Sequence, residues 1–158
     1  GAYCSENLRL LRILGRKGDY FMLNGIISAV TEKLTEKGAS PVYGAFDAVP
    51  ADRKNSGIYT IVGVRSFEST TPIYSLTKIY LPFRAELDIK VTAPENYSAE
   101  RLYEFFSDKI YPAAAELSGL ESFLKGISLK FDSNISRLVL TAVISASGTT
   151  KIERSSLQ

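Results

Sequence analysis

The stretch KIYLPFRAELDIKV, residues 78–91, alternates apolar and polar side chains without interruption. Successive side chains of a β-strand point to opposite faces of its sheet, so this period predicts one long strand with a buried face and a face in water. The apolar face holds Ile79, Leu81, Phe83, Ala85, Leu87, Ile89 and Val91. The polar face holds Lys78, Tyr80, Pro82, Arg84, Glu86, Asp88 and Lys90.

A helix is predicted on each side of this strand. Residues 23–37 carry apolar side chains at helical spacing and end before Gly38, a typical stop residue. After the break at Ala93-Pro94, Ser98 is expected to cap the second helix, and Pro112 is expected to kink it. The apolar stripe of the second helix comprises Leu102, Phe105, Phe106, Ile110 and Leu117.

Shorter strands complete the pattern. Residues 41–46 and 58–64 precede the long strand, and residues 66–75, rich in Ser and Thr, are expected to form a flexible loop. Residues 127–132 and 135–146 predict a closing hairpin, with Leu138, Leu140, Ala142, Ile144 and Ala146 facing inward. Because strands outnumber helices and several links are short, we expect an α+β fold. Its sheet would be mixed and mostly antiparallel, with about four or five strands and two main helices packed on one face.

At 158 residues the chain is expected to form a single domain. We assign this domain to residues 22–147, with residues 1–21 as an N-terminal appendage and residues 148–158 as a polar C-terminal tail. The one methionine, Met22, directly precedes the first helical pattern. Residues 1–21 are therefore either a translated region upstream of a natural start at Met22 or a genuine extension.

Composition argues against several kinds of active site. The chain has no histidine, which excludes His-based triads and the usual histidine metal sites. Its single cysteine, Cys4, allows neither an intramolecular disulfide nor a site of several thiolates. It also lacks a glycine-rich phosphate loop, a dinucleotide fingerprint and a calcium loop. We expect no catalytic residues, no cofactor and no metal.

The charge is small and unevenly placed. The formal net charge is +2, and Arg9, Arg12, Arg16 and Lys17 give the first 18 residues an excess of positive charge. The rest of the chain is close to neutral and carries no basic stripe that could follow a phosphate backbone, so nucleic-acid binding by the core is not expected. No apolar run approaches the roughly 18 residues that would span a bilayer, and a membrane partner is not expected.

Two patterns could suggest chemistry. Ser75-Leu76-Thr77-Lys78 and Ser122-Phe123-Leu124-Lys125 match the S-x-x-K motif of serine acyl-enzymes. That motif needs the serine on a helix with the lysine one turn away, whereas Ser75 precedes a strand, and the companion motifs are absent. We interpret both matches as coincidence.

Glu86 and Asp88 share the polar face of the long strand and could act as an acid and base pair. Arg84 and Lys90 flank them, so salt bridges across strands or across a subunit boundary explain the row more simply. We therefore assign Arg84, Glu86, Asp88 and Lys90 to a candidate subunit or partner interface. Arg53 and Lys54, in a charged cluster within a polar loop, are further candidates for partner contact.

The order of these elements resembles the tail terminator and tail-completion proteins of long-tailed bacteriophages, including relatives in prophages and phage-derived particles. The resemblance spans about residues 22–147. It rests on the segment from Val42 to Pro50, on a strand ending near Gly63-Val64, on the charged alternation of residues 84–91, and on the helix and hairpin that follow. No signature motif carries it.

The resemblance implies a structural protein that assembles as a ring, typically a hexamer. Such a ring caps the last disc of the tail tube, stops its growth and presents a surface to the head connector. Its partners would be further copies of this chain, tail-tube proteins and head-connector proteins. It would assemble in the bacterial cytoplasm and end in a virion or phage-like particle. The implied subunit contacts map to residues 66–75 and to Arg84, Glu86, Asp88 and Lys90.

Two other hypotheses about function stay open. The chain could be another tube or neck component of a virion or secretion tube with a related sheet. Alternatively, it could be a monomeric ligand-binding α+β module of a bacterial host. Residues 1–21 depart from the resemblance, since tail terminators usually lack such a segment.

Overall fold

A computed structural model describes residues 23–45, 57–117 and 119–154. The predicted residues 1–21, Arg53 and Lys54 lie outside these ranges. No helix in the described part of the chain is long and apolar enough to cross a membrane. The elements are α2 (Leu23–Glu36), β1 (Val42–Gly44), β2 (Tyr59–Ser69), β3 (Ile73–Tyr74), β4 (Lys78–Pro94), α4 (Ala99–Phe105), the π-helical turn η1 (Phe106–Ile110), α5 (Tyr111–Ala115), β5 (Glu121–Asp132) and β6 (Arg137–Glu153).

One mixed sheet organises the described chain. Its order is β1-β2-β4-β6-β5, and the two-residue strand β3 also pairs with β4, which gives six strands. Only β1 and β2 run parallel, and the other pairs are antiparallel. The long predicted strand is β4, which pairs with β6 over its full length from Lys78 to Pro94. The predicted α+β class is confirmed, with one short strand more than expected.

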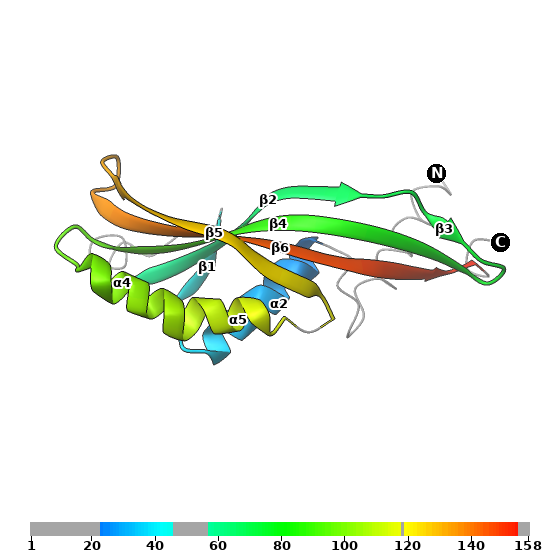
Figure 1. Cartoon of the computed structure of the whole chain (residues 1–158), viewed down its shortest axis with the longest axis horizontal. Helices are drawn as coiled ribbons and strands as arrows, with labels where there is room; N and C mark the ends of the chain where they lie inside the picture. Colours follow the sequence, from blue (N-terminus) through cyan, green and yellow to red (C-terminus); the bar gives the residue numbers. More distant parts are fainter. Residues whose placement is uncertain (1–22, 46–56, 118, 155–158) are drawn as a thin grey trace.

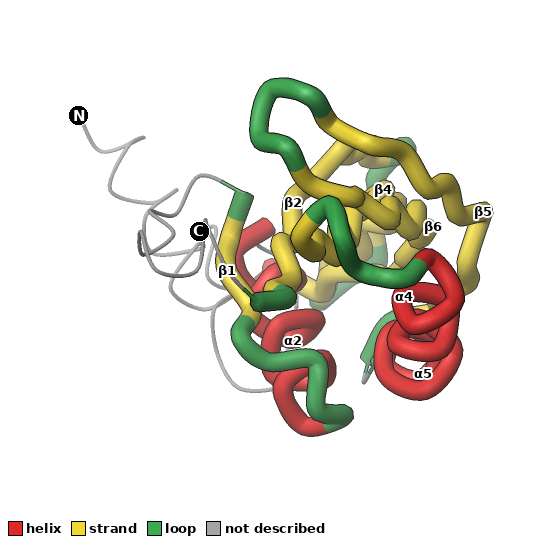
Figure 2. Tube along the Cα trace, turned by 90° about the vertical axis from the view of Figure 1, so that its left-hand side faces the viewer, coloured by secondary structure: helices red, strands yellow, loops and turns green. Residues whose placement is uncertain are grey.

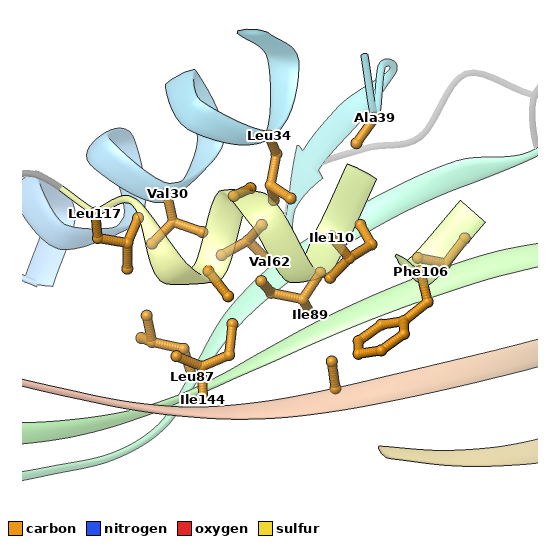
Figure 3. Packing of buried hydrophobic residues seen from close by; sticks show 14 of the residues in the cluster. Val30, Leu34, Ala39, Val62, Leu87, Ile89, Phe106, Ile110, Leu117 and Ile144 are labelled. Atoms are coloured by element: carbon orange, nitrogen blue, oxygen red, sulfur yellow. The ribbon is translucent and has the colours of Figure 1, made fainter. Parts of the chain in front are cut away.

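The helices pack on a single face of the sheet, as predicted (Figures 1 and 2). Leu87 and Ile89 of β4 and Ile144 of β6 are fully buried against Val30 of α2 and Ile110 at the end of η1 (Figure 3). All of these sheet positions belong to the face that the alternation assigned to the core. Burying such side chains contributes about 1.5–3 kcal/mol each, so this layer is the main source of stability.

Local signals in the second helix are confirmed. The Ser98 side chain accepts a hydrogen bond from the Arg101 amide at 3.3 Å, which caps α4. The kink expected at Pro112 takes the form of the π-helical turn η1, in which the Tyr111 amide donates to the Phe106 carbonyl. Proline lacks an N–H and its ring crowds the preceding turn, so the wider turn lies directly before it.

β2 and β5 are longer than the sequence predicts. Each contains a bulge, which interrupts the alternation pattern within the strand. β2 continues to Ser69 through part of the predicted 66–75 loop, with a register shift between Val64 and Ser66. β5 begins at Glu121 rather than at residue 127, with a shift between Leu124 and Gly126. An extra residue reverses the alternation at that point, which hides the strand from a two-residue pattern.

The C-terminal strand also exceeds its prediction. β6 reaches Glu153, so residues 148–153, which we expected in the polar tail, pair with residues 78–83 of β4. Backbone pairing holds this mostly polar segment on β4, and the side chains of Thr150 and Ile152 are buried there. Together with β3, these paired segments extend beyond the described helices (Figure 1). We call them the arm, and the rest of the described fold the body.

Candidate assembly surface

The predicted charged row lies on the sheet face opposite the helices. Arg84 and Lys90 are exposed, whereas Glu86 and Asp88 between them are half-buried. Neither Arg84 nor Lys90 takes part in an ion pair within the described residues. The two outer cations are therefore the members of the row best placed to meet another molecule.

Glu86 forms an ion pair with Lys125 of β5. Lys125 is the bulged residue of β5, and its side chain reaches across β6 to the Glu86 carboxylate on β4. The hydrogen bond from Lys125 lowers the pKa of Glu86, and the nearby charges of Lys125, Arg65 and Arg84 lower it further. Desolvation opposes these effects, and the net result is a pKa of Glu86 below its ordinary value.

Asp88 contacts the bulged residue of the other flanking strand. Oδ1 of Asp88 lies 3.0 Å from Nε of Arg65 on β2. This buried oxygen has no aligned hydrogen bond, so the contact is an ion pair without hydrogen-bond geometry. The two bulges therefore bring Arg65 and Lys125 toward the central carboxylates from opposite sides of β4.

This arrangement fits the salt-bridge interpretation of the two carboxylates. Each has a cation within its own chain, as in a salt bridge across strands. An acid and base pair would instead need two carboxyl groups whose environments drive their pKa values apart. The alternation of residues 78–91 does not point to Arg65 or Lys125 as partners of these carboxylates. One signal was present for Lys125, since an isolated glycine such as Gly126 within a strand often marks a bulge.

One end of the same face is closed by a buried arginine. Arg137 donates from Nε to the Thr92 hydroxyl at 3.1 Å and from Nη2 to the Thr92 carbonyl at 3.1 Å. Nη2 also donates to the Gly57 carbonyl, and the guanidinium lies over the Tyr59 ring at 4.7 Å from its centroid. Burial lowers the pKa of Arg137, and Tyr59 partly opposes that effect. This cluster ties the start of β6 to β4 and to the segment before β2.

The serines of both S-x-x-K matches make structural hydrogen bonds. Ser75 lies in the turn between β3 and β4, where its hydroxyl donates to the Lys78 carbonyl at 3.0 Å and accepts from the Lys78 amide at 2.9 Å. The Ser122 hydroxyl donates to the Ala114 carbonyl at 2.5 Å. Neither serine is on a helix with its lysine one turn away. The described residues contain no group of three His, Cys, Asp or Glu side chains placed to hold a metal.

An open hollow lies where β5 begins. Its lining includes Glu68, Arg84, Glu121, Ser147 and Thr149, and its volume is about 750 Å³. That volume is within the range of small-molecule sites, but such sites usually enclose most of their ligand and converge a few polar groups on it. The hollow brings Arg84 of the charged row close to the arm.

Comparison with known proteins gives no family. The chain matches no family model, and no curated protein matches it. Among solved structures, it is similar to the sheath/tube terminator of an extracellular contractile injection system, PVC, in the extended state, with a TM-score of 0.48 and 10% identity. That match covers 84% of this chain and 58% of the terminator, so the chain spans little more than half of the terminator's length.

A second similar structure is the type 4 fimbrial biogenesis protein PilO from Pseudomonas aeruginosa. Its TM-score is 0.30 at 12% identity, and the match covers 81% of this chain and 69% of PilO. At these TM-scores and identities, neither similarity carries an argument about what this chain does.

Proposed function

We propose that this chain is a structural tail protein of a phage or prophage, a tail terminator that assembles as a ring. The resemblance in element order to tail terminators implies that this ring is a hexamer. The ring caps the tail tube and joins it to the head connector. The role involves no catalysis and no cofactor. The protein acts in the bacterial cytoplasm during assembly and then in the virion or phage-like particle.

The observation that carries the proposal is the length of the sheet relative to the helices. β4 and β6 have 17 residues each. At about 3.3 Å per residue, each strand spans about 56 Å. The continuous helical run from Ala99 to Ala115 covers about 25 Å at 1.5 Å per residue. A sheet that extends so far beyond its helices is suited to contact other subunits.

An edge of the arm that no described strand covers supports the same role. β5 pairs with β6 only as far as Ser147, so from Gly148 to Ile152 no strand of the described chain lies on that side of β6. Open strand edges are templates for pairing with another chain, and proteins that do not use them usually cover them. An open edge on an extended arm therefore favours a subunit or tube contact.

A gene-deletion experiment tests the proposal. In the bacterium that carries this gene, particles are induced from the deletion strain and tail lengths are measured by electron microscopy. Loss of a terminator leaves tube growth unchecked, so we expect over-long tubes without attached heads and restoration by the wild-type gene. Tubes of normal length joined to heads in the deletion strain would refute the proposal.

The open alternatives predict different outcomes. Another tube or neck component would leave tails absent or unattached but not over-long. The hollow beside Arg84 is the observation that favours a ligand-binding module of the host. In that case the deletion strain would assemble normal particles, and light scattering would find a monomer. Tape-measure and tube genes beside this gene would favour the tail role, and their absence would count against it.

A further inference from the structure

The tip of the arm exposes apolar side chains that nothing in the fold of the body requires. We call residues 73–78 and 151–154 the arm tip. Leu76, at the apex of the turn between β3 and β4, is 95% exposed, and the neighbouring Tyr74 and Ile73 are 65% and 58% exposed. Polar or small residues usually occupy such turns. A fully exposed leucine there is therefore a candidate contact residue.

The arm tip is held in place by specific contacts. Ser75 closes the turn through its hydrogen bonds with Lys78. The Arg154 amide donates to the Thr77 carbonyl at 2.7 Å, and its guanidinium donates to the Ser75 carbonyl at 2.8 Å. A turn that is ordered in advance loses little conformational entropy on binding, which favours its use as a contact.

The arm tip is also positively charged. Lys78, Lys151 and Arg154 outnumber its one carboxylate, Glu153. Nζ of Lys78 lies 3.9 Å from Oε1 of Glu153. Lys151 lies over the ring of Tyr80, and Arg154 lies over the ring of Tyr74. Two exposed cations therefore belong to the arm tip, and one of them, Arg154, contacts the turn that carries Leu76.

The opposite end of the molecule carries an excess of negative charge and also exposes apolar side chains. We call residues 95–104 and 130–136 the acidic end, which comprises the start of α4 and the turn between β5 and β6 (Figures 1 and 2). It carries four carboxylates, Glu95, Glu100, Glu104 and Asp132, and two cations, Arg101 and Lys130. None of the four carboxylates forms an ion pair within the described residues. Tyr103, Phe131 and Ile135 are each about half exposed there.

We propose that the arm tip of one copy docks on the acidic end of a second copy, with Leu76 and Tyr74 as apolar anchors and Lys151 and Arg154 facing the carboxylates. The occupant is a second copy because one chain carries both complementary surfaces at opposite ends of its long axis. Such a head-to-tail contact is heterologous, and repeating it closes a ring when the rotation between copies permits. The inference rests on the proposed ring-forming role and names the surfaces that make the ring.

Sedimentation velocity of the purified full chain, over a range of concentrations, tests these surfaces. Leu76→Asp and Lys151→Glu are each expected to weaken self-association at least about tenfold. Glu100→Lys combined with Glu104→Lys should weaken it similarly from the other side. Tyr111→Asp, at an exposed tyrosine of α5 outside both surfaces, and Glu32→Lys, at an exposed carboxylate of α2, are the matched controls and should associate as the wild type does.

A mixing experiment tests whether the contact is head-to-tail. The Leu76→Asp chain keeps an intact acidic end, and the Glu100→Lys/Glu104→Lys chain keeps an intact arm tip. Together they have one functional pair of surfaces, so the mixture should form a one-to-one dimer and nothing larger, while each variant alone stays monomeric. A symmetric contact between like surfaces would instead give no mixed dimer.

The remaining outcomes separate this inference from the proposed function. A wild-type chain that stays monomeric at about 1 mM, or oligomers that are insensitive to the tip variants, would overturn the docking surfaces. The deletion experiment on tail length would be unaffected by either result. Conversely, if association depends on both surfaces but the deletion strain makes normal tails, the docking stands and the terminator role fails.

Discussion

The body and the arm tip place apolar side chains in opposite environments. In the body, Leu87, Ile89, Leu140 and Ile144 are fully buried beneath α2, η1 and α5. At the arm tip, Ile152 is buried, but Ile73, Tyr74 and Leu76 are mostly in water. Burial stabilises the folded chain, whereas an exposed apolar cluster contributes only when a partner covers it. Our proposal therefore assigns folding and assembly to different parts of one sheet.

The largest expected effect is in the body. Leu140→Ala removes a fully buried side chain and leaves a cavity, so we expect the free energy of unfolding to fall by about 2–5 kcal/mol. Urea denaturation measures the change. Ile73→Ala in the arm tip is the comparison and should cost less than about 0.5 kcal/mol, as surface substitutions usually do. Equal losses in the two variants would break the distinction between body and arm tip.

Substitution of Arg137 is expected to lower the free energy of unfolding by a smaller amount. Arg137→Lys keeps the charge but cannot donate to both the Thr92 and Gly57 oxygens, because an ammonium lacks the planar fork of a guanidinium. Leaving these buried groups unpaired should cost about 1–3 kcal/mol in urea denaturation. Arg84→Lys, at an exposed arginine of the same face, should be neutral. A neutral Arg137→Lys would show that the cluster does not hold the two strands together.

The smallest effect concerns the ion pair between Glu86 and Lys125. Because the folded state lowers the pKa of Glu86, the pair stabilises the fold at neutral pH, and that stability is lost as the pH falls through and below 4.5, the ordinary value. Lys125→Met should lower the melting temperature slightly at pH 7 and make it less sensitive to acid. Reversing both charges, with Glu86→Lys and Lys125→Glu, should restore the melting temperature at pH 7.

That charge exchange also sharpens the test of the charged row. Glu86→Lys alone would place a lysine beside Lys125, so any loss of assembly could follow from repulsion within one chain. The double exchange keeps the internal pair while altering the surface that a partner would meet. Retained fold with lost assembly would support a partner role for this row, and retained assembly would argue against it.

Much of the fold could be predicted because regular alternation and helical spacing report burial directly. The core face of β4 from Phe83 to Val91, the inward side chains of β6 and the Ser98 cap all follow from local pattern. Ile79 and Leu81, which the alternation predicts on the same buried face, lie in the arm and are only half-buried. The bulges at Arg65 and Lys125 could not be predicted the same way, because each reverses the alternation on which the strand assignment depends. Their ion pairs with Asp88 and Glu86 depend on strands far apart in sequence, so only the folded sheet reveals them.

The arm shows a different limit of sequence patterns. Residues 148–153 are mostly polar and were expected in the tail, yet they pair with β4 through backbone groups that every sequence carries. Leu76 gave no signal because a single leucine in a polar segment has no period. Its exposure follows from its position in the turn between β3 and β4.

Leu76→Asp in the complete particle tests whether the arm tip serves assembly and not folding. The variant gene is introduced into the deletion strain, tail lengths are measured by electron microscopy, and the purified variant is denatured in urea. We expect a free energy of unfolding within about 0.5 kcal/mol of wild type, together with over-long tubes that lack heads. Full restoration of normal tails by the variant, or a marked loss of its stability, would contradict the account.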